Sequence, residues 1–520
     1  MFIRSWILLH ISTRINISII SDFLIKLMKL PIGFFDTKMI GDIMQRIGDH
    51  SRIEAFLTST TLNTLFSFVN LIVFSIVLAL YSLKLFLVFL VASILYVLWI
   101  TIFLKKRKEL DYKRFAQASA EQSNLYQLIT GMQEIKLNNC EKQKRWEWEN
   151  IQAKLFRVSI KGLALSQYQQ SGAFFINETK NILISFVSAA AVIKGDMTLG
   201  MMTAVQYIIG QLNAPINQMI GFIQSAQDAK ISLERLGEIH NREDEEREEG
   251  IGNREQVIGN KEQGIGNREC VEMWRAASLD INNITFRYDE LGEDVLHDLS
   301  LHIPEGKVTA IVGMSGSGKT TLVKLLLGFY PPNKGEIRVG ETGLQNISHR
   351  FWRDRCGAVM QDGFIFSDTI ARNIAVGDEH IDTQRLLNAV RVANIQEMID
   401  GLPLGFNTKI GQEGKGISQG QRQRILIARA VYKNPDYLFF DEATNALDAN
   451  NEKVIMENLQ QFFKGRTVVV VAHRLSTVKN ADQIVVINHG RITETGTHEE
   501  LTAMRGEYFE LVRNQLELGK

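Results

Sequence analysis

Long uncharged stretches alternate with charged segments over the first part of the chain. No charged residue occurs between Phe56 and Leu83, and a second uncharged run extends from Leu85 to Leu104. Each run can cross a bilayer, because a membrane-spanning helix needs about 20 apolar residues. Lys84 alone separates the two runs. The pattern therefore predicts a tight transmembrane hairpin with spans near residues 60–83 and 85–104, and it disfavours buried core helices of a soluble domain.

A second pair of apolar segments follows further along the chain. One ends at Ile193, and the next is an uncharged stretch that starts at Met197 and contains Pro215, which predicts a kink. The short charged turn Lys194-Gly195-Asp196 lies between them. We expect the third and fourth spans near residues 172–193 and 198–222.

Charged residues around these spans predict their orientation. The basic run Lys105–Lys108 directly follows the second span, and such clusters concentrate on the cytoplasmic side. Glu178 and Lys180 adjoin the third span. We expect them to form a solvated or mutually paired helical face near its cytoplasmic half, with contact to a transported substrate as the less favoured alternative.

The first thirty residues are interrupted by charge and leave only residues 5–13 as an uncharged segment. That segment is short for a span, and it lacks the small-residue cleavage site of a signal peptide. The charged residues are Arg4, Arg14, Asp22, Lys26 and Lys29.

Residues 239–272 differ in composition from the segments on either side. The acidic run Glu243–Glu246 leads into a seven-residue repeat that begins at Gly250 and recurs twice. Each repeat has too few apolar residues for a coiled-coil seam. We interpret the segment as a flexible linker between a membrane domain over residues 1–238 and a further domain over residues 273–520.

The second half of the chain contains a phosphate-binding loop. The segment Gly313–Thr320 fits the pattern G-x-x-x-x-G-K-[ST] and follows the apolar run Val308–Val312, with an apolar helical segment after it. Glycines let successive backbone N–H groups point at phosphates, Lys319 adds a positive charge, and the Thr320 hydroxyl is placed to bind Mg²⁺. The predicted nucleotide ligands here are Gly313, Ser315, Gly316, Ser317, Gly318, Lys319, Thr320 and Thr321.

Other chemistry-bearing residues follow short apolar runs downstream. The run that begins at Tyr437 ends in Asp441, which can hold Mg²⁺, and Glu442, which can polarise an attacking water. Gln361 is a candidate for contact with the metal and the γ-phosphate, and His473 for orienting the water. Taken singly, each of these residues has an ordinary structural interpretation, but after a phosphate-binding loop they predict an ATP hydrolysis site.

The segment Ile417–Gln421 resembles the signature motif of ATP-binding cassette (ABC) proteins, whose usual form is L-S-G-G-Q. The chain departs from it at Ile417 and at Gln419, where the family usually has glycine. The resemblance implies that Ser418, Gly420 and Gln421 approach the γ-phosphate bound to the opposite subunit, and the change at Gln419 puts the hydrolysis rate in question.

Further similarity extends from Leu279 to Leu511. Tyr288 resembles the aromatic residue that stacks on adenine in this family, and stacking needs a flat side chain. Asn445–Asp448 is similar to the loop that links the two nucleotide sites, and Gly411–Gly414 is similar to an exporter segment that touches the membrane domain.

The membrane half resembles the family's exporters. Leu30–Asp36 is similar to a first cytoplasmic coupling loop, and Gly131–Lys136 to a second, which places these loops near residues 31–50 and 120–140. The family's half-transporter has six membrane helices. Against that pattern we expect an incomplete membrane domain in which the first helix and most of the second are missing. The wording around the signature most resembles bacterial peptide and bacteriocin exporters of the peptidase-containing subfamily, and we expect no peptidase domain in this chain.

The expected fold is an α-helical transmembrane domain of exporter type followed by an α/β P-loop nucleotide-binding domain with a helical subdomain. The resemblance implies an ATPase that uses ATP and Mg²⁺ and works as a homodimer or with a related half-transporter. It implies transport by alternating access across the bacterial inner membrane, with the nucleotide-binding domain in the cytoplasm. The implied cargo is a peptide. The alternatives are a truncated ATP-binding membrane protein that transports nothing, or one half of a split transporter.

Charge and cysteine content exclude some partners and sites but do not identify the function. Lys plus Arg and Asp plus Glu both number 58, so the net charge of zero argues against a nucleic-acid partner. Cys140, Cys270 and Cys356 lie far apart, so we expect neither a disulfide framework nor a metal cluster.

Overall fold

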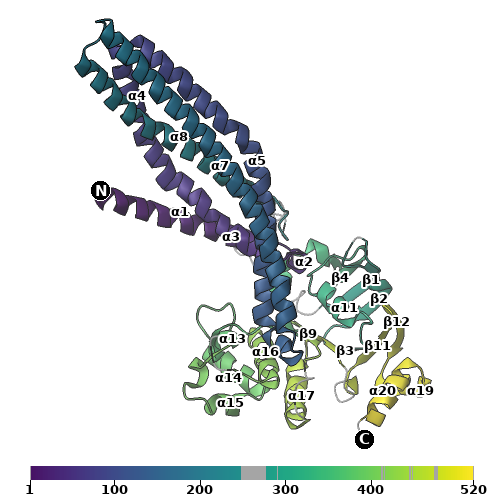
Figure 1. Ribbon diagram of the computed structural model, residues 1–520. Helices are drawn as coiled ribbons and strands as arrows, with labels where there is room; N and C mark the ends of the chain where they lie inside the picture. The colour runs from purple at the N-terminus through teal and green to yellow at the C-terminus, as the bar shows by residue number, and fades with distance from the viewer. Residues whose placement is uncertain are drawn as a thin grey trace. The chain divides into compact units, whose positions relative to one another are not determined.

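The computed structural model describes residues 2–246, 277–289, 291–411, 414, 416–443, 447, 449–472 and 478–518. The chain divides into two compact units, Met1–Asp244 and Glu245–Lys520. The predicted linker repeat and Cys270 lie outside the described residues. Figure 1 shows an N-terminal unit built of helices and a C-terminal unit that combines sheets and helices.

Long helices dominate the N-terminal unit. In chain order its elements are α1 (Phe2–Met28), α2 (Ile32–Thr37), α3 (Ile40–Ala55), η1 (Phe56–Thr60), α4 (Thr61–Tyr81), α5 (Leu83–Thr130), α6 (Met132–Leu137), α7 (Glu141–Ile193) and α8 (Leu199–His240). Helices α4, α5, α7 and α8 run side by side, whereas α1 diverges from them (Figure 1). Their contact is mainly apolar, with Leu78, Leu85, Ile184 and Leu212 buried in one cluster.

Three helical stretches among the described residues are long and apolar enough to cross a membrane, namely Ile40–Tyr81, Leu83–Thr130 and Glu141–Ile193. They overlap the first three predicted spans, near residues 60–83, 85–104 and 172–193, and are much longer than those spans; the first stretch ends at Tyr81, two residues before the first predicted span does. The fourth predicted span lies within α8, which has Pro215 in its interior and is not among these three.

The expectation of a solvated Lys180 is wrong. Its side chain is only 3% exposed. The ammonium Nζ donates to Asn177 Oδ1 at 2.8 Å and to Asn213 Oδ1 of α8 at 2.6 Å, and it lies 5.3 Å from the centre of the Phe89 ring. Amides on the same and a neighbouring helix therefore replace the solvent that was expected around this charge.

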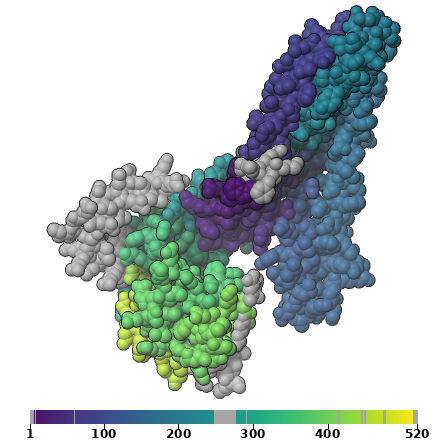
Figure 2. Space-filling model, turned by 90° about the vertical axis from the view of Figure 1, so that its left-hand side faces the viewer, coloured from purple at the N-terminus to yellow at the C-terminus, as the bar shows by residue number. Residues whose placement is uncertain are grey.

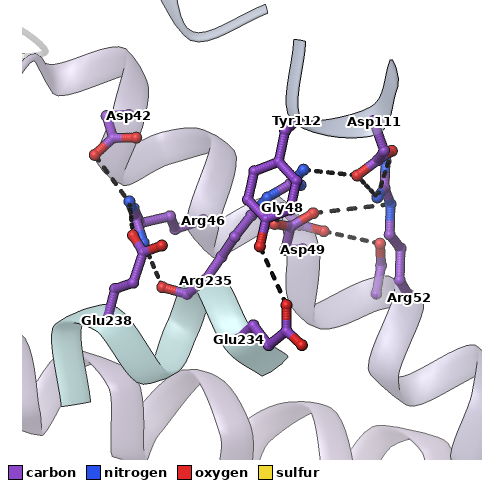
Figure 3. A network of polar contacts seen from close by, with 11 residues as sticks. Asp42, Arg46, Gly48, Asp49, Arg52, Asp111, Tyr112, Glu234, Arg235 and Glu238 are labelled. Carbon is purple, nitrogen blue, oxygen red and sulfur yellow. Dashed lines mark hydrogen bonds and ion pairs between the residues drawn. The ribbon is translucent and has the colours of Figure 1, made fainter. Parts of the chain in front are cut away.

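A buried network of charges joins α3, α5 and α8 (Figure 3). Arg235 of α8 is 2% exposed and donates to Asp49 of α3 at 3.2 Å and to Asp111 of α5 at 2.6 Å. The guanidinium also packs against the rings of Tyr112 and Phe115, 4.9 and 4.2 Å from their centres. A buried charge is tolerated only when such partners surround it, so this network fixes three helices relative to one another.

The C-terminal unit contains two main sheets with helices around them. Its described elements are β1 (Leu279–Phe286), β2 (Leu296–Ile303), β3 (Val308–Val312), α11 (Lys319–Leu326), β4 (Lys334–Val339), β5 (Thr342–Gly343), η3 (Leu344–Asn346), α12 (His349–Arg355), β6 (Cys356–Val359), β7 (Asp368–Thr369), α13 (Ile370–Ile374), α14 (Thr383–Val392), α15 (Gln396–Asp400), η4 (Gly405–Asn407), β8 (Lys409–Ile410), α16 (Gln419–Lys433), β9 (Tyr437–Asp441), α17 (Ala449–Phe463), β10 (Thr467–Val471), β11 (Gln483–Asn488), β12 (Arg491–Gly496), α19 (His498–Met504) and α20 (Glu507–Leu518).

The larger sheet has the strand order β12-β11-β3-β10-β9-β6, and its strands are parallel except β12. Every residue of β9 and β10 is buried, as expected for strands covered on both faces. The second sheet, β2-β1-β4-β5, is antiparallel. Helices α13 to α16 belong to a helical subdomain, which faces the viewer in Figure 2. The parallel order matters for chemistry because it brings the carboxyl ends of β3, β9 and β6 to one edge.

Candidate ATP-binding and hydrolysis site

The predicted phosphate-binding loop joins β3 to α11. Three of its glycines have positive φ, with values of 151° at Gly313, 79° at Gly316 and 101° at Gly318. Other residues rarely adopt this backbone conformation. At Gly313 a Cβ atom would also lie 2.1 Å from the carbonyl oxygen of Ile487 in β11. The loop can therefore keep its shape against the sheet only with glycine at this position.

Replacing Gly313 with alanine should deform the loop. The strained φ and the contact with Ile487 are expected to cost about 1–3 kcal/mol and to weaken nucleotide binding. Isothermal titration with a non-hydrolysable ATP analogue measures the second effect. A Gly48→Ala control should bind normally, because a Cβ there meets nothing within 4 Å. Unchanged affinity in Gly313→Ala would show that the loop shape does not determine binding.

Lys319 is held inside the loop that precedes it. Its ammonium donates to the carbonyl oxygens of Gly313 at 3.0 Å and Met314 at 2.7 Å. Burial lowers the pKa of Lys319, and the nearby carboxylates of Glu442 and Asp441 oppose that shift. An anionic phosphate beside the ammonium would favour its charged form in the same way. The geometry therefore suits polyphosphate.

Hard oxygen donors meet beside the start of α11. The Thr320 hydroxyl donates to Asp441 Oδ1 at 3.2 Å, and Asp441 is fully buried at the end of β9. Within the described ranges, no group of three His, Cys, Asp or Glu side chains could hold a metal by itself. A hydroxyl and one carboxylate fit Mg²⁺, which usually binds through few protein ligands together with water and phosphate oxygens.

A pocket of about 570 Å³ lies beside the phosphate-binding loop. Its walls include most of the predicted loop residues together with Gln361, which follows β6, and Glu442, which follows β9. Val295 also lines it from the segment before β2. Sequence reasoning missed Val295, because an isolated apolar residue outside any motif gives no signal.

Glu442 has an unusual backbone. Its φ is 52°, although it is not glycine, and its N–H donates to the carbonyl of Val471 in β10 at 3.2 Å. Among the described residues that line the pocket, Glu442 is the carboxylic acid, so it is the group in position to accept a proton from water there.

Tyr288 lies on the aromatic flank of the loop. Its ring meets Phe286 and Tyr330 edge-on, with ring centres 5.0 and 5.3 Å apart. Its hydroxyl lies 3.1 Å from that of Thr321, in the first turn of α11. The side chain is 45% exposed, so a face remains accessible for stacking with a base.

The signature residues do not line this pocket. Ser418 is the N-cap of α16, and it forms a capping box with Gln421, whose N–H donates to Ser418 Oγ at 3.2 Å. Ser418 and Gln419 are exposed and Gly420 is half-buried. The side chain of Gln419, at the position where glycine was expected, therefore fits without displacing a buried neighbour.

Several predicted residues lie outside the described part of the chain. They are His473, Asn445, Ala446 and Asp448, and, in the segment before the signature, Gln412 and Glu413. The role of His473 remains a prediction from its position after β10.

Comparisons with known proteins agree with this architecture. A family model described as "ABC transporter transmembrane region" matches residues 1–216, and one described as "ABC transporter" matches residues 296–445. The chain is 35% identical over 503 residues to the Toxin RTX-I translocation ATP-binding protein of Actinobacillus pleuropneumoniae, with 96% of this chain and 68% of that protein covered. It is 34% identical over 501 residues to the Leukotoxin translocation ATP-binding protein LktB of Mannheimia haemolytica, with the same coverage.

A solved structure of a bacterial Atm1-family ABC exporter with ATP bound has the same fold. The TM-score is 0.88 at 24% sequence identity, over 99% of this chain and 88% of that chain. The predicted order of a helical membrane domain and an α/β nucleotide-binding domain is thus confirmed.

Proposed function

The chain belongs to the ABC transporters as an exporter half-transporter with an ATPase domain, and from this premise we propose that two copies form an ATP-driven exporter of a polypeptide. The observation that carries the proposal is that the predicted nucleotide-contacting residues lie at two separate places on one copy of the chain. Lys319, Thr320 and Glu442 meet in one pocket, whereas Ser418 is exposed on α16 outside it. An exposed signature is available to a nucleotide held by a second copy.

Each side chain has a distinct role in this proposal. Lys319 and the backbone of the phosphate-binding loop hold the phosphates, and Tyr288 stacks on adenine. Glu442 orients the attacking water and accepts its proton. Mg²⁺ bound with the nucleotide would be held by Thr320 and Asp441, with Gln361 beside them, and would neutralise charge on the phosphates. Ser418 and the N-terminal turn of α16 donate to the γ-phosphate from the second copy.

The membrane unit would convert closure of this interface into alternating access. The short helices α2 and α6 lie within the two predicted coupling loops, so we assign them a role in this coupling. The basic run Lys105–Lys108 supports a cytoplasmic position for that end of the second span and hence for the ATPase domain, in the bacterial inner membrane. Two relatives are named for toxin translocation, which supports a toxin-like polypeptide as cargo. A bacteriocin-like polypeptide is proposed only from the wording around the signature motif.

Reconstitution in liposomes tests export. The protein is inserted with its ATPase domain outside, and uptake of a fluorescein-labelled unstructured polypeptide is followed after ATP addition. We expect uptake that requires ATP and is lost in Lys319→Ala, because removing the ammonium weakens phosphate binding. Sustained ATP hydrolysis without uptake of any such polypeptide would contradict polypeptide export and favour the non-transporting alternative.

A further inference from the structure

The signature helix α16 makes a direct contact with the hydrolytic centre of its own subunit. Gln423, in its second turn, is 5% exposed, and its side-chain amide donates to the backbone carbonyl of Glu442 at 3.3 Å. The element that begins with Ser418 therefore reaches the residue proposed to activate water.

This contact bears on a strained backbone. Glu442 has a φ of 52°, a conformation that is uncommon for residues other than glycine and persists where the surroundings hold it. Among the described residues, two hydrogen bonds do so: the Glu442 N–H donates to Val471 of β10, and its C=O accepts from Gln423. The direction of the Glu442 side chain follows from this backbone. The two hydrogen bonds therefore determine whether the carboxylate faces the pocket.

The next residue, Arg424, ties α16 to other elements of the unit. Arg424 donates to the carbonyl of Asn394 at 2.9 Å, and the Asn394 side-chain amide donates to Asn451 Oδ1 of α17 at 2.9 Å. Helix α17 begins directly after residues 445–448. Helix α16 is therefore tied both to the backbone of Glu442 and, through Asn394, to α17.

We propose that Gln423 is a positioning residue for ATP hydrolysis: it holds the backbone of Glu442 in its active conformation and links that backbone to the signature helix. When Ser418 engages nucleotide on a second copy, the motion of α16 reaches Glu442 of its own pocket through Gln423. The inference rests on the proposed function, in which Glu442 activates water and Ser418 serves the other copy.

Helix α16 does not depend on this one bond for its fold. Ile425, Leu426, Ile427 and Ala428 are each 4% exposed or less and belong to the main apolar cluster of the unit. Loss of the Gln423 amide should therefore change the position of Glu442 while leaving the helix packed.

The test replaces Gln423 with methionine, which has a similar length and no donor. In the full-length protein in lipid nanodiscs we expect kcat for ATP hydrolysis to fall about tenfold or more, because small misplacements of a catalytic group are costly, while KM for ATP changes less than about twofold. The matched control is Asn458→Leu. Asn458 of α17 also donates from a side-chain amide to backbone carbonyls at 3.3 Å, those of Arg391 and Val392, and it lies outside the pocket.

The double variant Gln423→Met with Glu442→Gln separates positioning from general damage. If Gln423 acts through Glu442, adding Gln423→Met to Glu442→Gln lowers kcat little further. Wild-type kcat in Gln423→Met, an equal loss in Asn458→Leu, or full additivity in the double variant would each overturn the proposal. Failure of the proposed function looks different, because Glu442→Gln alone would then keep its hydrolysis rate.

Discussion

Replacement of Glu442 with glutamine is expected to lower the rate of ATP hydrolysis by about 10²–10⁴-fold, the usual contribution of a general base, while ATP still binds. The amide keeps the size and most of the hydrogen bonding of the carboxylate but cannot accept a proton from water. The phosphate-binding loop and Lys319 are untouched, so the affinity for nucleotide should remain close to that of the wild type.

Steady-state phosphate release and equilibrium ATP binding measure the two quantities separately. Glu457→Gln is a suitable control, because Glu457 is exposed on α17 and does not line the pocket. If Glu442→Gln hydrolysed ATP at nearly the wild-type rate, Glu442 would not be the base, and His473 would become the first candidate to examine.

Replacement of Arg235 with alanine should destabilise the N-terminal unit by about 3–5 kcal/mol, the usual effect of breaking a buried ion pair by removing one partner. Asp49 and Asp111 would lose a shared cation in a buried setting, and Tyr112 and Phe115 would lose the guanidinium that packs against them. Part of the loss comes from packing, because the arginine also fills space between three helices.

Denaturant unfolding of the detergent-purified protein, followed by tryptophan fluorescence, measures this effect. Arg145→Ala is the control. Arg145 pairs with Glu149 one turn along α7, and both side chains are at least half exposed, so its removal should cost less than about 1 kcal/mol. The loss of stability in Arg235→Lys should lie between those of Arg235→Ala and Arg145→Ala, because lysine keeps the charge but lacks the planar guanidinium with its several donors. An Arg235→Ala protein that unfolds at the wild-type denaturant concentration would contradict the structural role of the network.

Local patterns predicted the elements that carry the ATP site. The strand Val308–Val312 and the helix that starts at Lys319 are where the motif places them, and the strand before Glu442 ends at Asp441. Such motifs are informative because phosphate binding constrains neighbouring residues. Gln361 and Glu442 line the same pocket because the strands that precede them, β6 and β9, are parallel neighbours in the sheet.

Contacts between distant segments were not predictable in this way. Lys180 was expected on a solvated or mutually paired helical face. Its burial could not be foreseen, because its partner Asn213 belongs to another helix. The partners of Arg235 lie in α3 and α5, and nothing in the residues around position 235 indicates them. Gln423 likewise looked like one polar residue in a run of polar residues, because its acceptor is a backbone atom of Glu442. Each case depends on tertiary packing that a single sequence does not display.

A cross-link between two copies tests the shared ATP site most directly. Cysteines are placed at Ser315, in the phosphate-binding loop, and at Ser418, at the start of the signature helix, in a Glu442→Gln background that retains ATP. Membranes are treated with a short bifunctional thiol reagent, with and without Mg²⁺ and ATP, and each single-cysteine variant controls for the native thiols. The account predicts a covalent dimer that forms only with both cysteines and increases with ATP. Absence of that dimer in the presence of bound ATP would contradict a site built from two copies.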